Sequence, residues 1–108
     1  SKDLYTVLVI DNDAPFPENP CDSPYLHYLR VNVGGPEAVK STTVVPFMWR
    51  KPAEGIIHRF YAIAYLQTEG EVDPKDLGVG VDPKKFDLRA LVRANHLVNR
   101  HQVLKLLA

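Results

Sequence analysis

Residues 52–67 read PAEGIIHRFYAIAYLQ, and the rest of the chain is organised around them. A loop with proline and glycine leads to the polar pair His58 and Arg59, and an uncharged apolar and aromatic run follows. Such a run predicts a strand from Arg59 to Gln67 that is covered on both faces. A polar pair at the mouth of a buried strand suits a binding site, because the strand fixes the geometry while the loop leaves access. The alternative is structural: His58 bonds a loop carbonyl and Arg59 pairs with a surface acid.

The composition predicts one small globular domain over residues 1–108. Hydrophobic residues make up 45% of the chain and charged residues 24%, which is ordinary for a globular protein. The 13 basic and 13 acidic side chains balance, so bulk charge gives no reason to expect nucleic acid or an anionic membrane as a partner. Cys21 is the single cysteine, which excludes an internal disulfide. No apolar run reaches the ~20 residues that a membrane span needs.

Three further stretches are predicted to be strands. Residues 4–10, LYTVLVI, are β-branched, aromatic and uncharged, which is typical of a central strand. Residues 42–45 form a short edge strand that Pro46 closes. Residues 25–33 alternate, and their more apolar face carries Tyr25, His27, Leu29, Val31 and Val33. His27 on that face is either a satisfied core histidine or part of a pocket wall.

Two acids follow the first strand, in the order Asp11-Asn12-Asp13-Ala14-Pro15. Aspartate and asparagine bond readily to nearby backbone groups, and proline stops a strand, so this segment is predicted to be a turn. Carboxylates at Asp11 and Asp13 have three possible roles. They bind a cation, act as an acid/base pair, or cap the turn.

The C-terminal third is predicted to be a loop from Thr68 to Asp82, followed by a helix. Asp82 is placed as the N-cap and Pro83 as the first helical residue. The expected apolar stripe of the helix, flanked by Leu91, consists of Phe86, Ala90, Ala94 and Leu97.

Beyond residue 88 every charged residue is basic: Arg89, Arg93, Arg100 and Lys105. This pattern indicates either a solvated helix face, favoured by the helix dipole, or a surface that contacts the phosphates of a nucleic acid.

The chain lacks the short motifs of several enzyme classes. It has no Gly-x-Ser-x-Gly elbow, no phosphate-binding loop with Lys and Ser/Thr, and no paired His or Cys at ligand spacing. A metal site would require His27, His58 and the two acids to converge through folding. We therefore predict no catalysis, no metal and no cofactor.

The motifs, taken in order, resemble the phosphatidylethanolamine-binding protein family. The resemblance rests on Asp11-Asn12-Asp13-Ala14-Pro15, on residues 25–32, on His58-Arg59-Phe60 and on residues 86–97, and it covers residues 4–97. It implies a mainly β fold, an antiparallel β-sandwich with a late α-helix. It also implies that the sandwich is incomplete within residues 1–108, so that outside contacts or further chain close it.

The family resemblance further implies a small pocket for phosphate-like anions at one end of the sandwich. Carried over by position, its candidate residues are Asp11, Asp13, Pro15, Tyr25, His27 and His58. In such a pocket the histidines donate to phosphate oxygens, while the acids orient the histidines or meet a headgroup amine.

Several positions depart from the family pattern. Asn12 replaces a proline, Ile56 stands where glycine is usual, and Phe60 replaces a tyrosine and so lacks its hydroxyl. Residues 48–52, MWRKP, occupy the place of a Gly-Pro-Pro rim, and residues 97–108 do not match.

These departures look most like the branch of the family found in the mitochondrial large ribosomal subunit. That branch implies a non-catalytic structural component in the mitochondrion, with other ribosomal proteins and rRNA as partners. The alternative is a cytoplasmic binder of a phosphate-bearing small ligand or phospholipid headgroup that regulates signalling partners. A metal-assisted hydrolase built on Asp11, Asp13, His27 and His58 is the third interpretation.

Overall fold

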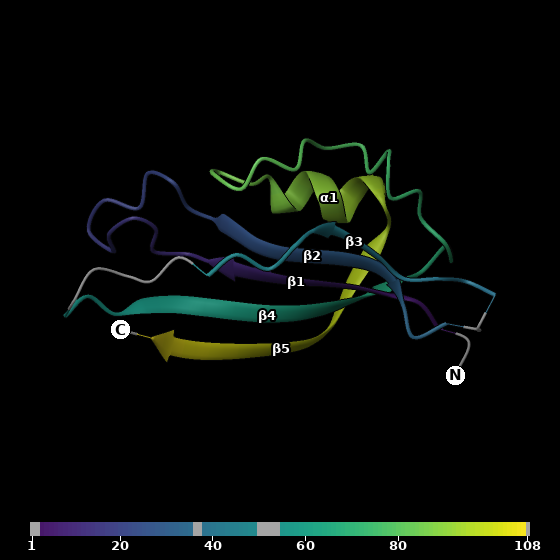
Figure 1. Ribbon diagram of the computed structural model, residues 1–108, viewed down its shortest axis with the longest axis horizontal. Helices are drawn as coiled ribbons and strands as arrows, with labels where there is room; N and C mark the ends of the chain where they lie inside the picture. The colour runs from purple at the N-terminus through teal and green to yellow at the C-terminus, as the bar shows by residue number, and fades with distance from the viewer. Residues whose placement is uncertain (1–2, 36–37, 50–54, 108) are drawn as a thin grey trace.

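The computed structural model describes residues 3–35, 38–49 and 55–107 of the chain. They form a five-stranded sheet in the order β3-β2-β1-β4-β5, in which every neighbouring pair of strands is antiparallel. A single short helix lies against one face (Figure 1). The elements are β1 (Tyr5–Asp11), β2 (Tyr25–Val33), β3 (Thr42–Val45), β4 (His58–Gln67), α1 (Leu88–Ala94) and β5 (Leu97–Leu107). The predicted mainly β architecture with a late helix is confirmed.

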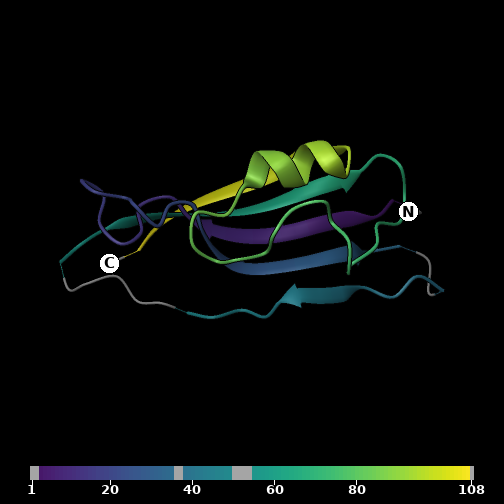
Figure 2. The ribbon, with the colours of Figure 1, turned by 90° about the horizontal axis from the view of Figure 1, so that it is seen from above.

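The core lies between the sheet and the layer made by α1 and the loop before it. Leu8 of β1 pairs with Leu29 of β2 and with Ile63 of β4, so these three side chains share the covered face. Leu77 and Phe86 of the loop and Leu91 of α1 pack on them. Figure 2 shows α1 over β4 and β5, with the loop crossing the remaining strands. The central position of residues 4–10 was predicted correctly.

The opposite face of the sheet is more open in the described part of the chain. Val7 and Val9 of β1 are half-buried. Of their partners on β4, Ala64 is half-buried and Ala62 is exposed. The prediction that β4 is covered on both faces is therefore wrong for the described residues. The helix and the long loop cover only the other face (Figure 1).

Two bulges interrupt β2 and break the predicted alternation of its side chains. Val9 pairs with Tyr28 and Ile10 with Leu26, which leaves His27 as an extra residue on β2. A second irregularity places Val31 and Asn32 opposite Thr6 alone, and Asn32 has a positive φ of 59°. Because a bulge shifts the facing of later residues, Leu26 joins Leu29 and Val31 in the core.

The helix begins later than predicted. Asp87 is the N-cap, and its carboxylate accepts the backbone N–H of Ala90 at 3.0 Å. Asp82 caps a turn instead, accepting the N–H of Lys84, while the carbonyl of Pro83 accepts the N–H of Leu26. This pairing with β2 holds residues 82–86 out of the helix. No helix in residues 3–35, 38–49 and 55–107 has the length and apolar character to cross a membrane.

The rotation of α1 also differs from the predicted stripe. Leu91 is the buried residue of the helix, with Leu88 and Val92 packed against the core, whereas Ala94 is exposed. Leu97 belongs to β5, an edge strand whose residues 98–106 are all exposed. The basic C-terminal segment is therefore half helix and half strand, and the interpretation of one solvated helix face is wrong.

A buried polar network fastens the start of β1 to the end of β4. The side-chain oxygen of Gln67 accepts the hydroxyl of Thr6 and the backbone N–H of Asn32, each at 2.9 Å. Its amide nitrogen donates to the side-chain oxygen of Asn32 at 2.8 Å and to the carbonyl of Gly70 at 2.9 Å. Asn32 in turn bonds both backbone groups of Val72. These hydrogen bonds link Thr6, Gln67, Asn32 and Val72, and so they tie the loop after β4 to the sheet.

We predict that Gln67→Leu destabilises the protein strongly. The apolar side chain leaves the Thr6 hydroxyl and the Asn32 N–H buried without partners, at a cost of roughly 1–3 kcal/mol for each group. Urea unfolding followed by circular dichroism measures the loss. Gln102→Leu on exposed β5 is the control, expected to change the free energy of unfolding by less than about 0.5 kcal/mol. Equal effects of the two substitutions would contradict a structural role for the network.

Candidate functional site

One end of the sheet gathers the residues that the sequence singled out. Asp11 ends β1, and its register partners are Tyr25, the first residue of β2, and Phe60, near the start of β4. Antiparallel pairing therefore brings the end of one strand and the beginnings of its two neighbours together, at the left-hand end of the sheet in Figure 1. We call this region the corner site, defined by Asp11, Asp13, Tyr25, His27, Trp49, His58, Arg59 and Phe60.

Asp11 uses both carboxylate oxygens within the protein. One oxygen lies 2.7 Å from Nδ1 of His58, and the other accepts the backbone N–H of Asp13 at 2.8 Å. Asp11 and His58 are both buried. Asp11 thus caps the turn, which was one of the three roles considered, and it also orients the imidazole of His58. The alternative that His58 bonds a loop carbonyl is wrong.

Asp13 is buried and fastened to Arg59. Its carboxylate accepts the backbone N–H of Arg59 at 2.7 Å and two guanidinium N–H groups, the shorter bond being 2.9 Å. These side-chain bonds from Arg59 hold the pKa of Asp13 below its usual value of 3.8. The Arg59 side chain is 53% exposed, so the pair joins a buried acid to a cation at the surface. Arg59 pairs with an acid as expected, but that acid is not a surface residue.

His27 occupies the bulge of β2 and is 1% exposed. Its Nδ1 lies 2.7 Å from the carbonyl oxygen of Met48, and the N–H of Met48 donates to the carbonyl of His27 at 3.0 Å. The first contact orients the ring, and the second pairs the backbone of His27 with that of Met48. Among the described residues, Nε2 of His27 and Nε2 of His58 are buried without a hydrogen-bond partner. His27 is therefore not a fully satisfied core histidine.

Aromatic rings bring the two histidines to the same place. The Phe60 ring centroid lies 5.4 Å from that of His27 and 6.2 Å from that of His58. Trp49 stacks on Phe60 at 5.3 Å, and Tyr25 packs on His27 at 4.9 Å. Trp49 is half-exposed, as are Phe47 and Met48, so the aromatic wall reaches the surface. As predicted, the imidazoles of His27 and His58 lie at the same corner of the sheet, beside Phe60.

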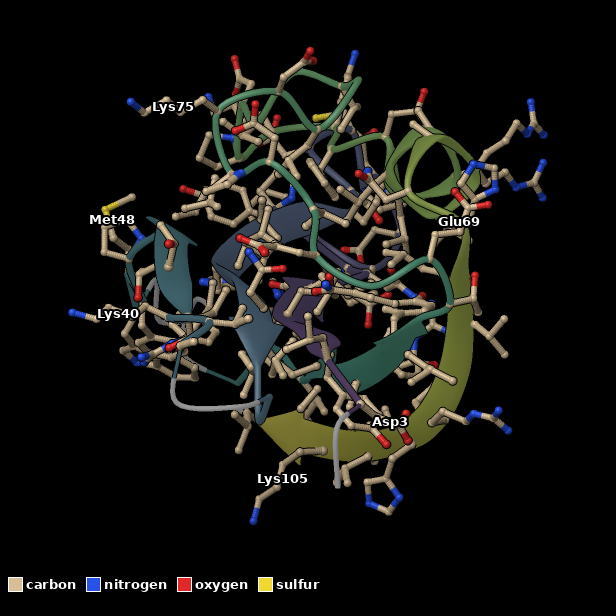
Figure 3. All side chains as sticks on the ribbon, turned by 90° about the vertical axis from the view of Figure 1, so that its right-hand side faces the viewer. Asp3, Lys40, Met48, Glu69, Lys75 and Lys105 are labelled. Atoms are coloured by element: carbon tan, nitrogen blue, oxygen red, sulfur yellow. The ribbon has the colours of Figure 1, made fainter. Side chains whose placement is uncertain are left out.

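Phe47 completes the aromatic side of the corner. Phe47 stacks on Trp49 with an interplanar angle of 10° and lies 6.4 Å from His27. No pattern in the sequence placed Phe47 against His27. Met48 points outward beside β3 (Figure 3). Arg50, Lys51 and Pro52, which were expected at the rim, lie outside the described residues.

The other predicted site residues lie in the turn after Asp13, on α1 and on β5. Pro15 is half-buried in the turn after Asp13 and is joined to Ala14 by a cis peptide bond. The basic residues divide between two elements: Arg89 and Arg93 are on α1, and Arg100 and Lys105 are on β5. Lys105 is the register partner of Phe60 and points into solvent (Figure 3).

A metal site is not assembled from these groups. Within residues 3–35, 38–49 and 55–107, no cluster of three or more His, Cys, Asp or Glu side chains is placed to hold an ion. The four carboxylate oxygens of Asp11 and Asp13 all accept hydrogen bonds from the protein. The acids therefore support His58 and Arg59, and among the described residues the buried Nε2 atoms of His27 and His58 are left without a hydrogen-bond partner.

No family model matches the sequence. Among curated proteins, "Protein MOTHER of FT and TFL1 homolog 2" of Oryza sativa subsp. japonica is 36% identical over 96 residues, which are 88% of this chain and 54% of the relative. "Protein TERMINAL FLOWER 1" of Arabidopsis thaliana is 31% identical over 72 residues, 66% of this chain and 40% of the relative. The chain thus spans about half the length, or less, of these relatives.

Solved structures match more of the chain. A phosphatidylethanolamine-binding protein from Plasmodium vivax superposes with a TM-score of 0.69 at 18% identity, over 95% of this chain and 62% of that one. The fold is that of a phosphatidylethanolamine-binding protein. A carboxypeptidase Y inhibitor, solved in complex with its cognate proteinase, superposes with a TM-score of 0.78 at 19% identity, over 98% of this chain and 60% of that one. The chain is thus similar in sequence to the two plant proteins and similar in fold to phosphatidylethanolamine-binding proteins.

We predict that Asp13→Asn makes stability less dependent on pH in the acid range. The pKa of Asp13 is lowered in the folded state, so its carboxylate stabilises the fold above about pH 3.8, and this contribution disappears as the pH falls through the lowered pKa. The natural chain should be more stable than the variant at neutral pH, with the difference shrinking in acid. Urea unfolding at a series of pH values measures this.

Glu71→Gln is the control, because Glu71 is exposed in the loop after β4. It should leave the pH dependence of stability close to that of the natural chain. If the advantage over Asp13→Asn is the same in acid as at neutral pH, the ion pair with Arg59 is not its source.

Proposed function

We propose that the corner site binds a small phosphate-bearing ligand, such as a phospholipid headgroup or a free phosphate ester, without catalysing a reaction on it. The observation that carries the proposal is the pair of buried Nε2 atoms on His27 and His58, which have no partner among the described residues. A buried polar atom without a hydrogen bond is costly, and a ligand oxygen is the kind of group that meets this requirement.

The chemistry of the rings favours an anion. In each ring Nδ1 faces an acceptor, the carbonyl of Met48 for His27 and the carboxylate of Asp11 for His58. Nδ1 therefore carries a proton, and on protonation of the ring Nε2–H becomes a second donor. Two such donors suit the oxygens of one phosphate.

The remaining side chains favour an organic phosphate over inorganic phosphate. Trp49, Phe47 and Phe60 present aromatic surface beside the histidines. Such surface accommodates the apolar part of an ester, and its ring faces attract an ammonium group. The absence of a catalytic step is supported by the two acids, because every carboxylate oxygen is engaged by the protein.

We predict that O-phosphoethanolamine at millimolar concentration shifts the imidazole NMR signals of His27 and His58, and does so at lower concentration than inorganic phosphate. His96 and His101, which lie outside the corner, are internal controls whose signals should stay in place. His27→Phe keeps a ring beside Phe60 but removes both nitrogens, and should weaken binding about tenfold or more. His101→Phe on β5 is the matched variant and should bind normally. Unmoved His27 and His58 signals at millimolar ligand would rule out the proposal.

A structural role in the mitochondrial large ribosomal subunit is the second candidate. Its support is the set of exposed basic residues on β5, Arg100 and Lys105, which suit rRNA phosphates, together with the apolar side chains exposed on the same strand. This role implies ribosomal proteins as partners and the mitochondrion as location. The relatives described above are not named as ribosomal proteins.

We expect a chain with this role to sediment with mitochondrial ribosomes in moderate salt. Replacing Arg100 and Lys105 together by Gln should then release part of the protein, because each removes a phosphate contact. Replacing Lys40 and Lys75, which are exposed elsewhere, is the control. Migration of the natural chain as free protein in the gradient would exclude this candidate.

A further inference from the structure

A groove lies where α1 crosses the outer strands of the sheet. It has a volume of ≈ 370 Å³ and is lined by Tyr65 of β4, by Asn99 of β5, and by Leu88, Arg89, Val92 and Arg93 of α1. None of these residues belongs to the corner site. Its size and mainly apolar wall are in the range of small-molecule sites. Figure 2 shows the helix lying over β4 and β5, where the groove is found.

A bulge in β5 lies at the floor of the groove. Tyr65 pairs with Asn99 and Ala64 with His101, so Arg100 is an extra residue without a partner on β4. Bulges bend a strand and redirect side chains, and they are frequent beside binding sites. The side-chain amide of Asn99 reaches across this bulge to Gln102 at 3.0 Å. The bulge at Arg100 therefore lies beside the opening of the groove.

The rim of the groove carries two unpaired cations. Arg89 and Arg93 are one helical turn apart, which puts both on one side of α1. Both are exposed, and among the described residues neither has an ion pair. Asp87, the acid next to them, accepts the N–H of Ala90 as helix cap. The chain between Arg89 and Leu107 contains no acid at all.

The floor is apolar apart from the hydroxyl of Tyr65 and the amide of Asn99. Tyr65 is 6% exposed, and burial raises the pKa of its phenol, so the hydroxyl stays protonated at neutral pH. Leu88 and Val92 are half-buried and pack against the core from the helix side. An apolar floor beside a doubly cationic rim is complementary to a molecule with an apolar body and an anionic head.

We propose that this groove binds an amphipathic organic anion, a carboxylate or phosphate monoester with an apolar chain or ring. Its body lies on Leu88, Val92 and the ring of Tyr65. Its head is held by Arg89 and Arg93, whose planar guanidinium groups match both kinds of anion. The two sources share this chemistry and are separated by experiment.

The test is an NMR titration of the full 108-residue chain with octanoate and, separately, with hexyl phosphate. The side-chain signals of Leu88, Val92, Tyr65 and Asn99 should shift with at least one of them, and the tighter ligand identifies the head group. Octanol, which has no charge, and acetate, which has almost no apolar body, should each bind about tenfold more weakly or worse.

The variant Arg89→Gln with Arg93→Gln should weaken binding of the better ligand about tenfold or more, since both charge-assisted contacts are lost. The matched control removes two cations elsewhere, Lys75→Gln with Lys105→Gln, and should bind normally. Both arginines are exposed, so circular dichroism of the double variant should be unchanged.

Four results would overturn the proposal: no shift of the groove signals, equal binding of octanol, equal binding of acetate, or equal loss of binding in the control variant. Shifts confined to His27 and His58 would assign the ligand to the corner site instead. Binding at the groove and binding at the corner site are thus reported by different NMR signals, so either proposal can be overturned without the other.

Discussion

The fold depends on the antiparallel pairing of β1 with β4, and both ends of this pair are fastened by buried polar contacts. At one end Asp11 and Asp13 hold His58 and Arg59. At the other end Thr6 bonds the side chain of Gln67. Between them Leu8 and Ile63 supply apolar burial, which gives stability but little directional information. A slip of one residue in this pair would flip every side chain and separate both sets of polar partners. The polar ends therefore fix the register that the apolar middle leaves open.

This fixed register produces the corner site. Because Asp11 is aligned with Phe60, the imidazole of His58 lies within reach of the Asp11 carboxylate without any contribution from the loops. Asp11, which helps to hold the strand pair together, consequently also orients the imidazole whose Nε2 is left without a partner among the described residues. Structural and functional roles of Asp11 cannot be separated by deleting it, since both would be lost together. Changes at His27 are more informative, because its support comes from the backbone of Met48.

The sequence was sufficient for most of the strands and for the acids and histidines of the corner, but it did not single out Trp49 as a site residue. Uncharged β-branched and aromatic runs predict β1 and β4. Asp11 ends β1, and His58 begins β4. What it could not supply was long-range pairing: the bond between Asp13 and Arg59 joins residues 46 positions apart. The helix start was misplaced because Asp82-Pro83 and Asp87 are both good caps, and only the bond from Leu26 to the Pro83 carbonyl decides between them. β5 was missed because its residues 98–106 are exposed and follow no period-two pattern.

The bulges explain why side-chain alternation failed where function is concentrated. His27, Asn32 and Arg100 each lie at a point where one strand carries an extra residue. His27 faces the corner, Asn32 joins the buried network, and Arg100 adjoins the groove under α1. A regular strand can offer a residue only to one of two faces, whereas an extra residue is released from that choice. His27 and Asn32 lie inside a predicted strand, whereas Arg100 lies in β5, which was not predicted. The corner site and the groove under α1 share no residue, yet each takes its shape from a bulge. In both cases the bulge interrupts a sheet whose central pair, β1 and β4, is held in register.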